Sequence, residues 1–285
     1  MKKIKKKLGI CKLTGEPGTF VKSHIIPRAL TLLSGSGEQR IEARIGHRIK
    51  KSYNSWFDPE LVIRKGEDIL GDLDTYAIVE LRKHRLIWSG WGSDLALKEE
   101  EFITYHEDFN MRKVLFSNAT LIRTFFLSLL WRAAASNLKE MADVILEDWE
   151  VEDLRQRVAS GKPGPSKDYP ILLDQITSVG FLHNRTPFIE DAEIPEGSFK
   201  EPARYVRFYF DGLVIKIYLA NKNNPSDEFM KFSIGESDSD SSLVIGRNFK
   251  NSRTFDNLKE VVEDSNKTKL KTLDKNFSHT RRKIK

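Results

Sequence analysis

The stretch Tyr205-Val-Arg-Phe-Tyr-Phe-Asp-Gly-Leu-Val-Ile-Lys-Ile-Tyr-Leu219 carries the strongest fold signal in this chain. Two β-prone runs flank Asp211-Gly212, and an Asp-Gly pair supplies the positive φ angles that a two-residue hairpin turn needs. Apolar and polar side chains alternate along residues 205–210, so one face of that strand should be buried. The stretch predicts an antiparallel hairpin, which we place in a β-rich C-terminal region spanning residues 167–262.

On the N-terminal side of this hairpin, the sequence in the middle of the chain predicts helices. Residues 101–160 form a helical region in which Met111–Leu138 has apolar residues on overlapping helical stripes, nearly all round. A helix of that kind is buried in the centre of a domain. Ser160–Ser166 then holds two glycines and two prolines, which no helix tolerates, so the segment separates this region from the β-rich one.

The first region, residues 8–100, mixes both kinds of element. Thr19–Ile26 reads as a strand, and Pro27 ends it because proline cannot donate to a sheet ladder. Glu67–His84 has apolar residues at the spacing of an amphipathic helix. The whole pattern predicts an α+β fold with a helical middle, bounded by basic tails at residues 1–7 and 266–285.

Composition limits the class of protein. Hydrophobic residues make up 39% of the 285 residues and charged residues 31%, which is ordinary for a folded chain. The longest apolar stretch, residues 121–135, contains two arginines and is too short for a membrane span. The N-terminus lacks the apolar segment of a signal peptide, and one cysteine excludes an internal disulfide. We therefore expect a cytoplasmic protein that does not enter a membrane.

The formal net charge of +6 resides in the tails. Residues 1–7 hold five lysines, and residues 266–285 hold eight Lys or Arg against one Asp. Without the tails, the 47 basic and 41 acidic residues become 34 and 40. Basic tails attract phosphate backbones with little sequence discrimination, although they are also a common solubility device.

Three short motifs in the N-terminal region carry a resemblance to a known family. They are Cys11-Lys-Leu-Thr14, Phe20-Val-Lys-Ser-His-Ile-Ile-Pro27 and Ile63-Arg-Lys-Gly-Glu67. In this order they resemble an HNH (ββα-metal) endonuclease-like family with the pattern C-x-x-C, S-H-I-I-P, C-x-x-C-E. Residues 126–135 also resemble the helix that follows the nuclease-like part. The resemblance implies a degenerate HNH-like module within residues 8–100.

The resemblance implies a zinc knuckle whose ligands are largely missing here. In the family, the two C-x-x-C pairs hold a structural zinc ion. Only Cys11 remains in this chain, because Thr14, Ile63 and Gly66 occupy the other three positions. One thiolate cannot form such a site, so we expect no structural zinc. The knuckle should instead be held by packing of apolar residues, for which the candidates are Leu13, Val62 and Ile63.

For catalysis, the resemblance implies His24 as the general base, a role that requires a neutral imidazole near pH 7. It implies one divalent cation, Mg²⁺ or Mn²⁺, with Glu67 as its oxygen ligand. Ser23 stands where active HNH enzymes often carry a metal-binding Asp. The alternatives are a structural role for His24, and a Glu67 that only places negative charge on the first turn of a helix.

A basic cluster is the candidate surface for binding phosphates. An exposed, solvated face explains such a run equally well. The candidate nucleic-acid-binding residues are Arg28, Arg44, His47, Arg48, Lys50 and Lys51.

Three hypotheses for function remain. The leading one is a protein that binds DNA or RNA and cleaves phosphodiester bonds as an HNH-like endonuclease. By analogy, standalone proteins of this kind often belong to bacterial or phage conflict systems, including antiviral defence. The second keeps the fold without catalysis, as a binding or protein-partner subunit. The third places the function in the β-rich half as a sensor or docking platform, which truncation at Ser160–Ser166 would isolate.

Overall fold

The computed structural model describes most of the chain. The described residues are 7–31, 40–43, 50–52, 55–105, 110–181, 183–192, 195–219, 224–235, 240–256, 258–260 and 263, with the backbone alone for 40–43 and 50–52. Over these residues the fold is α+β, with mostly antiparallel sheets, as the sequence predicted. Within the described part, no helix is both long and apolar enough to cross a membrane.

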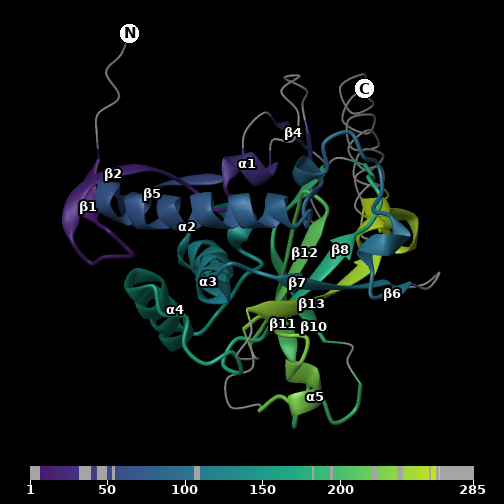
Figure 1. Ribbon diagram of the computed structural model, residues 1–285. Helices are drawn as coiled ribbons and strands as arrows, with labels where there is room; N and C mark the ends of the chain where they lie inside the picture. Colours follow the sequence, from purple (N-terminus) through teal and green to yellow (C-terminus); the bar gives the residue numbers. More distant parts are fainter. Residues whose placement is uncertain are drawn as a thin grey trace, which may run out of the picture.

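The N-terminal part combines a three-stranded sheet with a long helix. Strand β2 pairs antiparallel with both β1 and β5, and α2 follows β5 directly. Figure 1 shows α2 lying along this sheet. Two antiparallel strands followed by a helix are the order that the HNH resemblance implies, although membership of the family stays a prediction. The bounds are β1 (Leu8–Ile10), β2 (Pro17–His24), α1 (Arg28–Thr31), β5 (Phe57–Ile63) and α2 (Arg64–Lys83).

The turn at Cys11 meets the start of α2 at the positions of the family's zinc cysteines. The backbone N–H of Thr14 donates to Cys11 Sγ at 3.4 Å, and a Cβ atom on Gly66 would lie 2.9 Å from the same sulfur. A glycine therefore lets the helix approach the cysteine closely. The predicted apolar packing is confirmed for Leu13, Val62 and Ile63, which share one buried core with Cys11.

The β-rich part forms a seven-stranded sheet in the order β10-β11-β12-β8-β13-β7-β6. Neighbouring strands are antiparallel except β8 and β13, which run parallel. The bounds are β6 (Thr104–Tyr105), β7 (Asn110–Leu115), β8 (Ile171–Ile176), β10 (Phe188–Asp191), β11 (Arg204–Phe210), β12 (Leu213–Tyr218) and β13 (Ser241–Arg247). Two of its strands, β6 and β7, thus come from the region that the sequence predicted to be helical.

A second small sheet links the first and last regions of the chain. Strand β3 (Arg40–Ala43) pairs antiparallel with β4 (Lys50–Ser52) and parallel with β9 (His183–Arg185). The segment between β2 and β5 therefore reaches the β-rich part of the molecule.

The central helix begins later than its apolar pattern suggested. Residues 111–115 belong to β7, in which the side chains alternate between buried and exposed, a period of two that fits a strand. The Asn118 side chain then caps α3 by accepting a hydrogen bond from Leu121 N at 3.0 Å. The helices are α3 (Ala119–Ala135), α4 (Asp148–Ser160) and α5 (Asp227–Met230), with short 3₁₀ turns at Trp88–Gly90, Glu99–Glu101, Lys139–Met141 and Phe249–Asn251.

One continuous core joins all three regions. In Figure 1, α3 lies between α2 and the large sheet, with α4 beside it. The core includes Leu70 of α2, Phe126 of α3 and Phe208 of β11, and none of them is exposed by more than 1%. Since β6 and β7 complete the large sheet, a fragment starting at residue 167 would expose this core. We therefore expect that truncation there does not leave a folded C-terminal half.

The segment Ser160–Ser166 is held in place rather than acting as a free linker. Gly161 ends α4 with a positive φ of 68°. The Arg123 guanidinium on α3 donates to the carbonyl oxygens of Gly164 and Pro165 at 2.7 and 3.0 Å. The prolines and glycines therefore end the helix, as predicted, but the turn they make packs against α3.

The hairpin predicted from the Asp-Gly pair is confirmed. β11 and β12 pair from Tyr205 opposite Tyr218 to Phe210 opposite Leu213. The turn residues Asp211 and Gly212 have φ angles of 51° and 79°. A Cβ atom on Gly212 would also lie 2.3 Å from the Trp88 indole, so both conformation and space require glycine there.

We expect Gly212→Ala to destabilise the protein more than Gly197→Ala. Both glycines have φ of 79°, but only Gly197 has open space around its Cα. The backbone strain should cost about 1–2 kcal/mol at each site. Overpacking against Trp88 should add about 1–3 kcal/mol at Gly212 alone. Urea unfolding of the two variants measures the difference, and equal losses would contradict the close packing of this turn against Trp88.

Candidate active site at the end of strand β2

His24 is the last residue of β2 and lies opposite Phe57, the first residue of β5. The two rings are tilted, with centroids 6.1 Å apart, and Lys22 Nζ lies 3.6 Å from the centre of the Phe57 ring. Lys22 lies where the pairing of β2 with β5 shifts register, between Val21 and Ser23, and its positive charge acts on the His24 imidazole. The half-buried imidazole therefore has an ammonium group close by.

The surroundings of His24 favour its neutral form. Burial lowers the pKa of the imidazole below its ordinary value of 6.5, and the positive charges of Lys22 and Arg28 lower it further. Asp74 opposes this shift, while Arg132 adds to it. The ring is therefore uncharged at neutral pH, the form in which a histidine accepts a proton.

Ser23 of β2 and Glu67 of α2 lie next to each other, on the side of the strand that faces the helix. Ser23 is 1% exposed, and Glu67 sits in the first turn of α2. Burial raises the pKa of the Glu67 carboxyl above its ordinary value, and a hydrogen bond with the Ser23 hydroxyl and the charge of Arg132 oppose that rise. Ser23 Oγ and Glu67 Oε2 are both buried, and neither has another hydrogen-bond partner among the described residues. A carboxylate bound by one hydroxyl still has acceptor capacity, so this oxygen is suited to a cation or a donor from a ligand.

Arg132 ties the end of β2 to α2. Its Nη1 atom donates to the His24 carbonyl oxygen and to Asp74 Oδ2, both at 3.1 Å, while Nη2 donates to Asp74 Oδ1 and Ser128 Oγ. A charge within an apolar helix requires a buried partner, and Asp74 supplies it. The two residues lie 58 positions apart in the sequence, and no local pattern indicates that they pair.

No protein-family model, no curated protein and no solved structure matches this chain. What the site can do is therefore inferred from its own side chains.

A divalent cation fits the donors at this site only in part. The described residues include no group of three or more His, Cys, Asp or Glu side chains placed to hold a metal ion. Asp74 is already engaged by Arg132, which leaves Glu67 Oε2 as the available carboxylate oxygen. Mg²⁺ in phosphate-processing sites is often held by one or two carboxylates, with substrate phosphate and water completing its shell. Glu67 thus suits a cation that arrives with a phosphate substrate.

Among the predicted phosphate-binding residues, Arg28 is the one whose side chain the structure locates. It is exposed on α1, and its charge reaches His24. Lys50 and Lys51 belong to β4, where the structure describes the backbone alone. Arg44, His47 and Arg48 lie outside the described residues. Lys22 was not predicted, and it lies at a register shift between β2 and β5 that no sequence pattern marks.

Proposed function

We propose that this protein binds nucleic acid and hydrolyses phosphodiester bonds at the end of β2, as an HNH-like endonuclease. The observation that carries the proposal is the pairing of a neutral imidazole with flanking cations at one strand end, beside a half-buried carboxylate whose hydrogen-bond partner is the Ser23 hydroxyl. The first group suits a proton acceptor, the second attracts phosphate, and the third suits a divalent cation. A cytoplasmic location and a role in bacterial or phage conflict are part of this proposal.

In the proposed reaction, each residue of the site has a separate role. Water attacks the phosphorus atom, His24 accepts the proton of that water, and the bond to the 3′ oxygen breaks. Lys22 and Arg28 hold the phosphate near the imidazole by charge. Glu67 would hold Mg²⁺ or Mn²⁺, which when bound would stabilise the charge on the departing oxygen. Arg132 positions β2 through the His24 carbonyl group.

The experiment combines substrates, metals and a matched pair of variants. Plasmid, single-stranded DNA and RNA are incubated with full-length protein in Mg²⁺, Mn²⁺ or EDTA. We expect metal-dependent cleavage that falls by about 10²-fold or more in Glu67→Gln, because the amide lacks the charge that holds the cation. Asp68→Asn, next to it on the exposed side of α2, removes the same charge and should cleave like the wild type. Equal rates in Glu67→Gln and wild type would reject the metal-binding role.

A second function, nucleic-acid binding without cleavage, is favoured by specific departures at this site. Ser23 replaces the metal-binding Asp, and Arg132 occupies Asp74. In that case the folded wild-type protein retards DNA or RNA in EDTA as well as in Mg²⁺, and cleaves neither. Glu67→Gln would then bind as the wild type does.

A further inference from the structure

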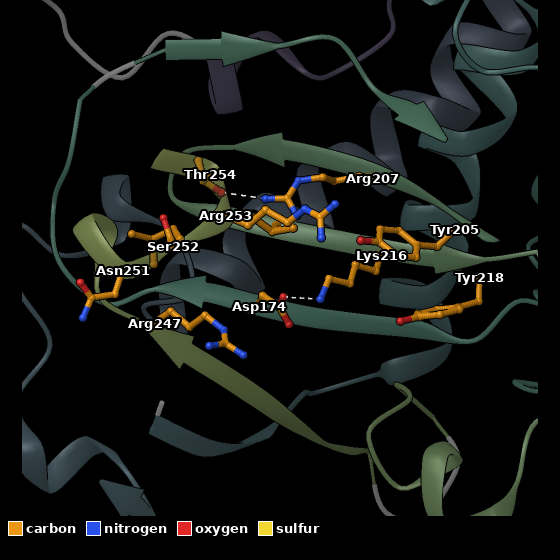
Figure 2. A pocket seen from close by; sticks show the side chains of 12 residues that line it. Asp174, Tyr205, Arg207, Lys216, Tyr218, Arg247, Asn251, Ser252, Arg253 and Thr254 are labelled. Atoms are coloured by element: carbon orange, nitrogen blue, oxygen red, sulfur yellow. Dashed lines mark hydrogen bonds and ion pairs between the residues drawn. The ribbon is translucent and has the colours of Figure 1, made fainter. Parts of the chain in front are cut away.

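The face of the seven-stranded sheet carries a pocket that the proposed active site does not use. The cavity measures about 250 Å³ and lies over β8, β11 and β12, closed by the end of β13 and the segment that follows it. In Figure 2, charged side chains from these separate elements converge on the cavity. The charged lining residues are Asp174, Arg207, Lys216, Arg247 and Arg253.

The pocket has an excess of positive charge. Its lining holds four cationic side chains and one carboxylate, Asp174, whose Oδ2 atom lies 2.6 Å from Lys216 Nζ. Glu190, next to the pocket, is shared: its oxygens lie 3.8 Å from Arg207 Nη1 and 3.3 Å from Arg253 Nε. Glu190 also accepts a hydrogen bond from the Tyr205 hydroxyl at 2.8 Å, so its carboxylate is divided among three partners. Arg207 is only 3% exposed, and a buried charge without full compensation is costly.

Arg185 does not line this pocket, but its guanidinium interacts electrostatically with Arg207 and Arg253. It is 5% exposed and stacks over the Phe188 ring, 4.1 Å from its centre. Its Nε and Nη1 atoms are buried and have no hydrogen-bond partner among the described residues. Burial and the nearby charges of Arg207 and Arg253 lower the pKa of Arg185 to about 10, although Glu190 and Glu260 oppose this. The repulsion among these arginines is what a bound anion would relieve.

The opposite wall of the pocket offers an unused acceptor. Asp174 accepts from Lys216 through Oδ2, but its buried Oδ1 atom has no partner among the described residues. Buried polar atoms in folded proteins are nearly always hydrogen-bonded. Because Asp174 lines the cavity, this spare acceptor is suited to a ligand hydroxyl or amino group, which donates to it.

We propose that this pocket binds a small phosphate monoester that carries free hydroxyl groups, a sugar phosphate or a mononucleotide. The phosphate accepts hydrogen bonds from Arg207, Arg253 and Arg247, since guanidinium groups match phosphate oxygens in pairs. A ligand hydroxyl donates to Asp174 Oδ1. A cavity of about 250 Å³ lies just under the usual range for small-molecule sites, about 300–1,000 Å³, and favours one small ligand over a polymer.

The test uses calorimetric titration of the full-length protein with ribose 5-phosphate, adenosine 5′-monophosphate, inorganic phosphate and ribose. We expect both monoesters to bind saturably below about 10 mM and ribose not to bind, because the cations supply most of the affinity. Tighter binding of the nucleotide identifies a mononucleotide site, whose base would contact Tyr205 or Tyr218 in the pocket wall. Equal affinities identify a sugar-phosphate site.

Matched variants locate the binding. Arg247→Ala removes an exposed lining residue and should weaken the binding of ribose 5-phosphate about tenfold. This is the loss of affinity expected for one charge-assisted hydrogen bond. Arg204→Ala removes an exposed cation from the same sheet, outside the pocket lining, and should leave the affinity unchanged. Asp174→Asn should reduce the preference for ribose 5-phosphate over inorganic phosphate, because only the sugar reaches Oδ1.

Three results would overturn the proposal. One is the absence of saturable binding by a protein whose circular dichroism shows it to be folded. Another is an equal loss in Arg247→Ala and Arg204→Ala, which would mean general attraction by charge. The third is binding of a 5′-phosphorylated oligonucleotide without binding of either monoester. None of these results depends on whether the end of β2 cleaves nucleic acid.

Discussion

Arg132→Met is expected to lower the free energy of unfolding by about 3–5 kcal/mol, the usual loss when one member of a buried ion pair is removed. The guanidinium is 1% exposed and makes hydrogen bonds to the His24 carbonyl oxygen, to both oxygens of Asp74 and to Ser128 Oγ. Methionine fills a similar volume but satisfies none of these acceptors, so the partly buried Asp74 carboxylate loses its counter-charge.

Two further variants show whether the loss comes from the unpaired carboxylate. Combining Arg132→Met with Asp74→Leu removes both charges and should recover much of the stability, since apolar replacement of a whole buried pair is often neutral. Arg82→Met, at an exposed position on α2, should change stability by about 0.5 kcal/mol or less. Urea unfolding curves measure all three. A double variant no more stable than Arg132→Met would show that the ion pair is not the source of the loss.

His24→Ala is expected to slow phosphodiester cleavage by about 10²–10⁴-fold, the contribution typical of a general base. In the wild type, the rate should rise with pH as the imidazole loses its proton and reach half its maximum below pH 6.5, because burial, Lys22 and Arg28 lower the His24 pKa. Lys22→Gln removes a positive charge that disfavours protonation. The pKa of His24 should therefore rise, and the midpoint of the profile should move to higher pH.

His84 provides the control for this prediction. It is half-buried at the opposite end of α2, where it lies beside Glu80 and Phe116 rather than near β2. His84→Ala should leave the cleavage rate within about twofold of wild type, the range of a substitution away from the site. Initial rates across a series of buffers measure both effects. Undiminished cleavage by His24→Ala would show that His24 is not the general base. A pH–rate profile that is the same in Lys22→Gln and the wild type would show this too.

Much of the local structure follows from short stretches of sequence. The Asp211-Gly212 pair predicted its hairpin because only residues that tolerate positive φ can make that turn. The helix α2 was recognised from its apolar spacing, and the end of α4 from its glycines and prolines. The predicted start of α3 was wrong, because β7 was taken as part of the helix. An apolar segment next to a buried helix fits the periodicity of a strand as well as that of a helix.

For the candidate site, the sequence predicted the residues but not their environment. The motif around Ser23-His24 and the acidic residue Glu67 were visible in the sequence because each lies in a short, recognisable pattern. Their environment was not visible. The neutral state of His24, the burial of Glu67 beside Ser23 and the Arg132–Asp74 pair all arise from contacts between residues that are far apart in the chain.

By itself, the sequence determined the α+β class, the hairpin of the large sheet and the candidate residues His24 and Glu67, since backbone conformation and periodicity are local properties. Tertiary structure alone decided that β6 and β7 extend the C-terminal sheet and that one core unites the chain. It also gathered the arginines Arg185, Arg207 and Arg253 around Glu190. Burial and the distances between charges depend on which distant segments pack together, and no local pattern encodes that.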